Sequence, residues 1–165
     1  MAKTFFIADP HFDDFRFLAY ENRPFEDVHA MNEALIARWN AAVSEEDSVW
    51  IIGDFGGEGR ESEILARLNG TKYLVRGNHD TRPNDYYRAA GFSEVYDLPV
   101  VFGGFWLLSH EPMYVNTNMP YANLFGHVHA SPLYKDFSPH HFCVCAERIN
   151  YTPISLEEIL GKIQG

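Results

Sequence analysis

The alternation of apolar runs with amphipathic segments is the feature that most constrains the fold of this chain. Short apolar runs lie at residues 4–8, 48–52 and 72–75. Between them, residues 28–43 and 58–69 repeat apolar side chains three and four positions apart, which is the period of an amphipathic helix. Strands that alternate with helices at this spacing form βα units in a largely parallel sheet. We therefore expect an α/β fold.

The second half of the chain has a different pattern. Residues 93–102 and 105–108 are expected to be strands that form a hairpin around Gly103–Gly104. A further strand is expected at 142–146, and residues 155–158 have the capping-box pattern that opens a last helix. Because no linker or internal repeat divides the chain, we expect a single domain over residues 1–165.

Polar side chains follow the expected strands at their carboxyl ends. In open α/β sheets, ligands bind outside the carboxyl ends of the strands, so these side chains are expected to converge. They fall in five short motifs: Asp9-x-His11, Gly53-Asp54, Gly77-Asn78-His79-Asp80, the single His110, and Gly126-His127-x-His129.

The chemistry of these motifs predicts metal binding. They offer carboxylate oxygen, amide oxygen and imidazole nitrogen but no thiolate, a set that suits Mn²⁺, Fe or Zn²⁺. The candidate ligands are too many for one ion and suit two ions that share a carboxylate. On an extended backbone His127 and His129 would point to the same side, so their spacing alone suggests that both serve one ion.

Composition narrows the classes of partner and compartment. The formal net charge of −10 disfavours strong nonspecific binding to nucleic acid. The first apolar run is too short for a signal peptide, and no run approaches the length that spans a bilayer. Cys143 and Cys145 are interpreted as reduced thiols in or near the core, so a cytoplasmic location is expected and no membrane partner is.

Taken together and in this order, the five motifs resemble those of the calcineurin-like metallophosphoesterases. They cover residues 9–129, and residues 150–158 resemble the closing segment of small bacterial and phage members. The resemblance implies a four-layer α/β/β/α sandwich with two mixed sheets. It also implies hydrolysis of phosphodiester or phosphomonoester bonds by a hydroxide that bridges two divalent metal ions. Mn is the favoured metal, and Fe, Zn, Ni and Co are alternatives.

The resemblance also implies a role for each residue of the motifs. His79 would be the catalytic histidine that assists the leaving oxygen, and Asp80 would orient its imidazole. One ion would be held by Asp9, His11 and His129 and the other by Asn78, His110 and His127, with Asp54 between them.

The sequence offers few further candidates for substrate binding. Arg23, Arg76 and Asn78 are candidate phosphate contacts, and for Arg76 a structural ion pair is the favoured interpretation. The aromatic segment 12–27 is expected to be a loop, either a substrate wall or an anchored connection. Glu147 is interpreted as a surface residue.

Two rival functions remain open from the sequence. One is a nuclease that acts on short single-stranded ends, and the other is a catalytically silent interaction scaffold. We favour a small phosphoester substrate, because the chain lacks basic runs and retains every candidate ligand. The natural substrate and the oligomeric state are not predicted.

Overall fold

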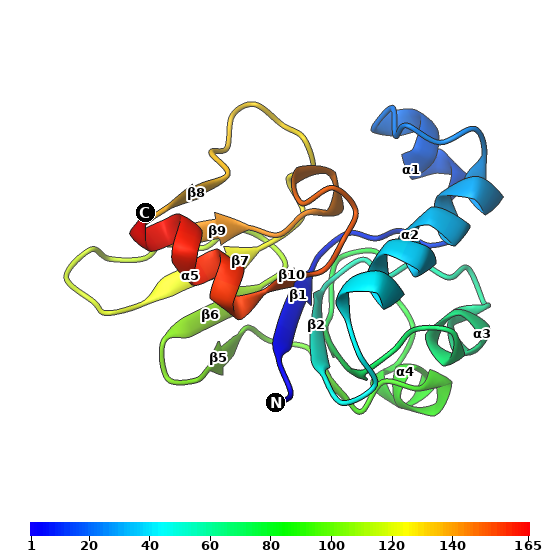
Figure 1. Cartoon of the computed structure of the whole chain (residues 1–165), viewed down its shortest axis with the longest axis horizontal. Helices are drawn as coiled ribbons and strands as arrows, with labels where there is room; N and C mark the ends of the chain where they lie inside the picture. Colours follow the sequence, from blue (N-terminus) through cyan, green and yellow to red (C-terminus); the bar gives the residue numbers. More distant parts are fainter.

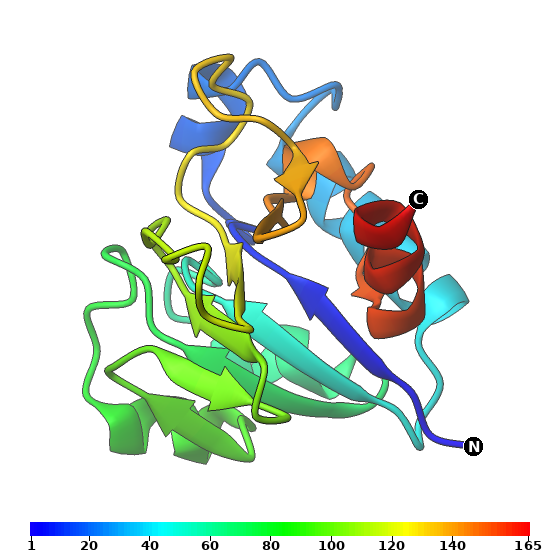
Figure 2. The same ribbon diagram turned by 90° about the vertical axis from the view of Figure 1, so that its left-hand side faces the viewer.

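A computed structural model describes residues 1–165, the whole of the chain, and contains two five-stranded sheets that face each other (Figures 1 and 2). The first sheet has the strand order β10-β1-β2-β3-β4, and its strands are parallel except for β10. Its strands are β1 (Thr4–Ile7), β2 (Ser48–Ile52), β3 (Thr71–Val75), β4 (Glu94–Tyr96) and β10 (Ile154–Ser155).

The second sheet has the order β5-β6-β7-β9-β8 and is mixed. Strands β6, β7 and β9 run parallel, whereas the edge strands β5 and β8 are antiparallel to their neighbours. These strands are β5 (Val100–Phe102), β6 (Trp106–Ser109), β7 (Ala122–Phe125), β8 (Phe137–Ser138) and β9 (His141–Cys143). The prediction of an α/β sandwich with two mixed sheets is confirmed.

Helices complete the sandwich. They are α1 (Phe15–Tyr20), α2 (Val28–Ala42), α3 (Glu61–Ala66), α4 (Asn84–Ala90) and α5 (Leu156–Gln164), with a 3-10 turn at Ala146–Arg148. Asp27 caps α2 by accepting the backbone N–H of Ala30, and Ser155 and Glu158 form the predicted capping box of α5. None of these helices combines the length and apolarity needed to cross a membrane.

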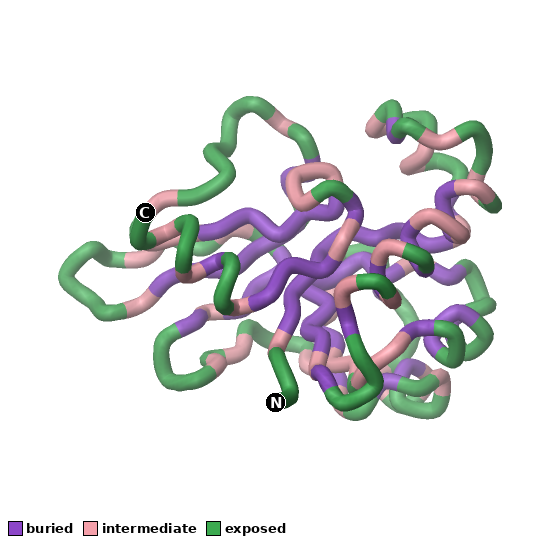
Figure 3. Tube along the Cα trace, viewed as in Figure 1, coloured by how far each residue is buried: buried purple, intermediate pink, exposed green.

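Two apolar cores hold the layers together, and Figure 3 shows the buried strands at the centre of the molecule. One core lies between the first sheet and helices α2, α3 and α4 and includes Trp39, Ile51 and Leu65. The other includes Trp50 of the first sheet and Leu124 of the second. Helix α5 joins the second core through Ile159 and contacts β1 and β10 of one sheet and β8 and β9 of the other.

Three local expectations need correction. The predicted strand 93–102 is broken, because β4 pairs with β3 in the first sheet and β5 pairs with β6 in the second. Pro99 lies in the crossing segment, where it can neither donate to a ladder nor continue β4. The predicted helix 58–69 is shorter, because Gly57, Glu58 and Gly59 all have positive φ and α3 begins only at Glu61.

The third correction concerns segment 12–27, which contains a helix. Asp14 accepts the backbone N–H of Arg16 and so caps α1. The aromatic residues of this helix are spaced by two and three positions, which does not resemble an amphipathic period, so the pattern gave no helical signal. The helix places Phe17 over the candidate site, where its ring stacks on His11 at 3.6 Å between centroids.

Candidate metal centre

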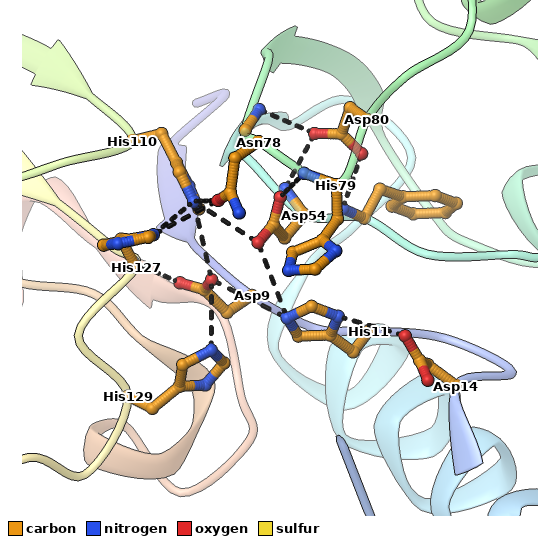
Figure 4. A network of polar contacts seen from close by, with 12 residues as sticks. Asp9, His11, Asp14, Asp54, Asn78, His79, Asp80, His110, His127 and His129 are labelled. Carbon is orange, nitrogen blue, oxygen red and sulfur yellow. Dashed lines mark hydrogen bonds and ion pairs between the residues drawn. The ribbon is translucent and has the colours of Figure 1, made fainter. Parts of the chain in front are cut away.

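The five motifs meet at the carboxyl ends of five strands. Strands β1, β2 and β3 of the first sheet end directly before or close to the first three motifs, and β6 and β7 of the second end before the last two. The two sheets are joined at this end, because Ala8 donates its backbone N–H to Val144 and accepts one from Ala146. The convergence expected from the topology is therefore confirmed (Figure 4).

The backbone of the site is left-handed at five ligand candidates. The φ angles are 56° at Asp9, 48° at His11, 54° at Asp54, 68° at His127 and 48° at His129. Side chains rarely adopt this region, and each such residue costs on the order of 1–3 kcal/mol. The expectation that His127 and His129 extend from a strand is therefore wrong, because β7 ends at Phe125.

In each of the two aspartates, one carboxylate oxygen accepts a backbone N–H and the other faces the site. Asp9 Oδ2 accepts the backbone N–H of His127 at 2.8 Å and lies 3.5 Å from the Cys145 thiol. Its Oδ1 lies 3.8 Å from His11 Nε2 and 3.6 Å from His129 Nε2. Asp54 Oδ1 likewise accepts the backbone N–H of His79 at 2.9 Å. One oxygen of each carboxylate is thus held in place, and the other faces the histidines.

The donors form two adjacent groups that share Asp9. One comprises Asp9, His11 and His129, and the other Asp9, Asp54 and His110. In each group the ligand atoms lie within 4.8 Å of one another. Asp54 Oδ2 faces one histidine of each group, at 3.7 Å from His11 Nε2 and 3.3 Å from His110 Nε2.

Asn78 and His127 extend the second group. Asn78 Oδ1 lies 2.9 Å from His110 Nε2 and 3.2 Å from His127 Nδ1, and both Asn78 and His127 are exposed. All seven predicted ligands are therefore brought together, and Figure 4 shows their side chains pointing toward one region.

Unpartnered buried atoms show that this region suits a cation. Asp9 Oδ1 and both ring nitrogens of His11 are buried and make no hydrogen bond. Such atoms are costly to bury unless something else satisfies them. Because the atoms are oxygen and imidazole nitrogen, a divalent transition metal ion fits the donor set.

The electrostatics of the site agree with this interpretation. Burial raises the pKa of Asp9 to about 7, although His110 and His129 oppose that shift. Burial lowers the pKa of His11 to about 4, so at neutral pH the imidazole is uncharged and one of its ring nitrogens has a free lone pair. For His110 burial also lowers the pKa, but the Asp54 and Asp9 carboxylates outweigh it and raise the pKa to about 9. The buried carboxylates thus favour added positive charge next to them.

Three of the four histidine ligands have a polar group of the protein next to their Nδ1 atom. His129 Nδ1 lies 3.0 Å from Glu147 Oε1, and His110 Nδ1 lies 3.0 Å from the carbonyl oxygen of Ile52. Asp14 stands 3.7 Å from His11 Nδ1. In each case Nε2 is left to face the site, as is usual for metal-bound histidines. The sequence did not predict these roles for Glu147 and Asp14, because neither residue belongs to one of the five motifs.

Arg23 and Glu147 require correction. The Arg23 side chain is fully buried, pairs with Glu147 at 2.6 Å, and donates to the carbonyl oxygens of Asp9 and Pro10. Its guanidinium therefore supports the backbone beneath the site and has no free face for a phosphate. Glu147 is not a surface residue, because its side chain is only 4% exposed. Arg76 does form an ion pair, with Asp97 at 2.8 Å.

Asp80 also differs from its expected role. Its buried carboxylate accepts backbone N–H groups of Asp54, Phe55 and Gly77 and makes no hydrogen bond to the His79 imidazole. The ring of His79 is exposed and instead lies edge-on to His11 and to Phe17, with centroids 5.7 and 5.2 Å apart. Asp80 thus positions the loop that carries Asp54.

Comparison with known proteins places this site in a family. The model of the family described as calcineurin-like phosphoesterase matches residues 2–158. An uncharacterized protein of Methanocaldococcus jannaschii is 34% identical over 99% of this chain and 93% of its own length. The Gene 66 protein of Mycobacterium phage L5 is 27% identical over 77% of the chain and 60% of its own length.

A solved structure shows the same architecture. The protein of unknown function from Aquifex aeolicus superposes with a TM-score of 0.73 and 25% sequence identity. The match covers 99% of this chain and 100% of that one.

Proposed function

Because the chain belongs to the calcineurin-like phosphoesterase family, we propose that it hydrolyses phosphodiester or phosphomonoester bonds with two divalent cations, Mn²⁺ being the best candidate. The observation that carries this proposal is the pair of adjacent donor groups that meet at Asp9 and Asp54. Their oxygen and nitrogen donors suit Mn²⁺, Fe, Zn²⁺, Ni or Co.

In this proposal, Asp9, His11 and His129 hold one cation. Asn78, His110 and His127 hold the other, and Asp54 stands between them, in keeping with its two short distances to His11 and His110. Divalent cations there would lower the pKa of a bound water and polarise the oxygens of a phosphoester.

The remaining residues act on the substrate directly. In this proposal, the imidazole of His79, which is exposed, donates a proton to the oxygen of the leaving group. The backbone N–H of this residue donates to Asp54 Oδ1 at 2.9 Å, which holds the backbone of His79 next to the donor groups. Asn78 can donate from its amide nitrogen to a phosphoryl oxygen. The proposed reaction does not pass through a covalent intermediate between the substrate and a side chain.

The rival functions receive less support. A nuclease with a long footprint needs a basic surface, and the chain has a net charge of −10. A silent scaffold has no need to keep the donor groups, which are complete here. A cytoplasmic location and a small phosphoester as the partner remain predictions.

The test is steady-state hydrolysis by protein stripped of metal and reloaded with Mn²⁺. We expect turnover of bis(4-nitrophenyl) phosphate, of 4-nitrophenyl phosphate, or of both, and none by Asp54→Asn. Cyclic nucleotides and labelled single-stranded oligonucleotides, assayed beside them, separate a small-ester enzyme from a nuclease. Absence of turnover on every ester by metal-loaded protein contradicts the proposal.

A further inference from the structure

Two separate cavities border the donor groups. The larger, of about 490 Å³, is lined by Asn78 and His110 together with Leu98 and Met113. The smaller, of about 210 Å³, is lined by His11 and His79. The two cavities share no lining residue, and only the smaller one includes the proposed proton donor.

The carboxylates that line the smaller cavity already have hydrogen-bond partners within the protein. Arg16 donates to Asp14 at 3.0 Å and to Glu58 at 2.9 Å. Glu61 is buried and accepts the hydroxyl of Tyr86 at 2.7 Å. These groups therefore satisfy one another.

Arg82 is the exception among the charged residues of this cavity. Its exposed guanidinium forms no ion pair and donates no hydrogen bond, whereas every other arginine of the chain donates at least one from its side chain. Its backbone N–H is tied to the Tyr87 hydroxyl at 3.2 Å, and its guanidinium carbon lies 5.2 Å from the centroid of the Tyr86 ring. The cation is thus held beside the cavity without an anionic partner.

An unpaired guanidinium on a residue that lines the same cavity as the proposed proton donor suggests what the cavity binds. Arg38 also lacks a carboxylate partner, but its guanidinium donates to Asn150, so Arg82 is the one arginine whose guanidinium has no hydrogen-bond acceptor in the protein. A guanidinium matches the geometry of carboxylate and phosphate groups, and stacking on an aromatic ring limits its motion. A ligand with an anionic group would supply the missing partner.

On the basis of the proposed function, we propose that the cavity beside His79 receives the leaving group of the substrate and that Arg82 binds an anionic group on it. In the reaction, the bond from phosphorus to the leaving oxygen breaks and a bond from phosphorus to the oxygen of water forms. The attacking water gives up one proton to solvent, and His79 takes up a proton from solvent after it has protonated the leaving oxygen. His79 gives a proton to the leaving oxygen, so the rest of the leaving group must lie next to this histidine. Arg82 lines the same cavity and is then a specificity-determining residue.

The test compares matched substrates. Methyl 4-nitrophenyl phosphate and methyl 3-carboxy-4-nitrophenyl phosphate differ by one carboxylate on the leaving group. In a second pair, the charged member carries a phosphonomethyl group in place of the carboxylate. The ratio of kcat/KM for the charged and uncharged member is measured in the Mn²⁺-loaded wild type and in Arg82→Gln. We expect the ratio to fall by roughly 10- to 100-fold in the variant, the worth of a hydrogen bond to a charged group. Whichever pair shows the larger fall distinguishes carboxylate from phosphate.

Two further variants sharpen the comparison. Arg88→Gln removes an arginine of α4 that is paired with Asp85 and Glu94 and lines neither cavity, so the ratio should not change. Arg82→Lys keeps the charge without the planar fork, and its ratio should lie between those of wild type and Arg82→Gln.

Failure of this proposal is distinguishable from failure of the proposed function. No hydrolysis of any substrate by the loaded wild type contradicts the function, whereas hydrolysis with the same ratio in wild type and Arg82→Gln overturns only the role of Arg82. Calorimetric binding of (3-carboxy-4-nitrobenzyl)phosphonate and its carboxyl-free analogue, in which a P–C bond replaces the scissile P–O bond and no ester bond remains, tests that role without turnover. We expect Arg82→Gln to lose the preference for the carboxylated compound, and an unchanged preference overturns the proposal.

Discussion

The Asp80 carboxylate accepts a hydrogen bond of 2.7 Å from the backbone N–H of Asp54. It also accepts the backbone N–H groups of Phe55 and Gly77, at 3.1 and 2.8 Å. A single buried side chain therefore ties the loop after β2 to the loop after β3. It acts on the site through the position of Asp54, because it makes no hydrogen bond to the imidazole of His79.

Asp80→Asn should therefore weaken metal binding. The amide NH₂ of asparagine would face backbone donors that now meet a carboxylate oxygen, so the loop that carries Asp54 must shift. Loss of such a supporting group lowers metal affinity by about 10- to 100-fold. Titration of Mn²⁺ against a competing chelator measures the effect, and Asp85→Asn on the exposed face of α4 is the control. An unchanged affinity together with a lower kcat would instead favour the original interpretation, in which Asp80 orients His79.

Replacement of Arg23 should lower the free energy of unfolding rather than weaken substrate binding. Arg23→Leu leaves Glu147 buried without its cation, and breaking a buried pair costs about 3–5 kcal/mol. Urea unfolding of the metal-free protein measures this loss. Arg67→Leu, which breaks the exposed pair with Glu33, should cost about 1 kcal/mol or less. A normal free energy of unfolding combined with a raised KM would show that Arg23 contacts phosphate after all.

Gly126 is predicted to admit no side chain. A Cβ at this position would contact the Ala8 side chain and Asp9 Oδ2, which is the oxygen that anchors Asp9. Gly126→Ala should therefore lower both thermal stability and Mn²⁺ affinity. Gly161→Ala in α5 meets no atom within 4 Å and should stabilise the protein by about 0.5–1 kcal/mol. Wild-type affinity in Gly126→Ala would mean that the contact between the two sheets tolerates movement.

His79→Ala should retain metal and lose turnover. The backbone N–H that His79 donates to Asp54 is preserved in alanine, so the donor groups stay in place. Loss of a general acid lowers kcat by about 10²- to 10⁴-fold, most strongly for an alkoxide leaving group and least for nitrophenolate. Steady-state rates with both kinds of leaving group, combined with metal analysis, check this prediction. Full activity on the poor leaving group would remove His79 from this role.

The sequence predicts correctly that these candidate side chains converge, because the strand topology brings them to one place. Asp9, Asp54 and Asn78 each follow a recognisable parallel strand, and the carboxyl ends of such strands meet at one edge. The same logic fails for Glu147, which lies in a short 3-10 turn with no periodic pattern. Only the folded chain shows that this carboxylate lies between Arg23 and His129.

Backbone conformation sets a second limit on prediction. Asp and His tolerate a left-handed backbone better than most residues, but the residue types at Asp9 and His129 do not specify it. It depends on hydrogen bonds between distant segments, such as the one from Asp9 N–H to the Gly53 carbonyl oxygen. Pro99 marks the break between β4 and β5 in the sequence, but nothing in the pattern indicates that the two strands pair in different sheets.

The most direct measurement is the activity of chelator-stripped protein on bis(4-nitrophenyl) phosphate as Mn²⁺ is added back, with bound ions counted in the same samples. We predict no turnover without metal and a saturable rise in rate that reaches its plateau as two ions bind per chain. Full occupancy of the site without any hydrolysis, or undiminished hydrolysis by the metal-free protein, would contradict the account.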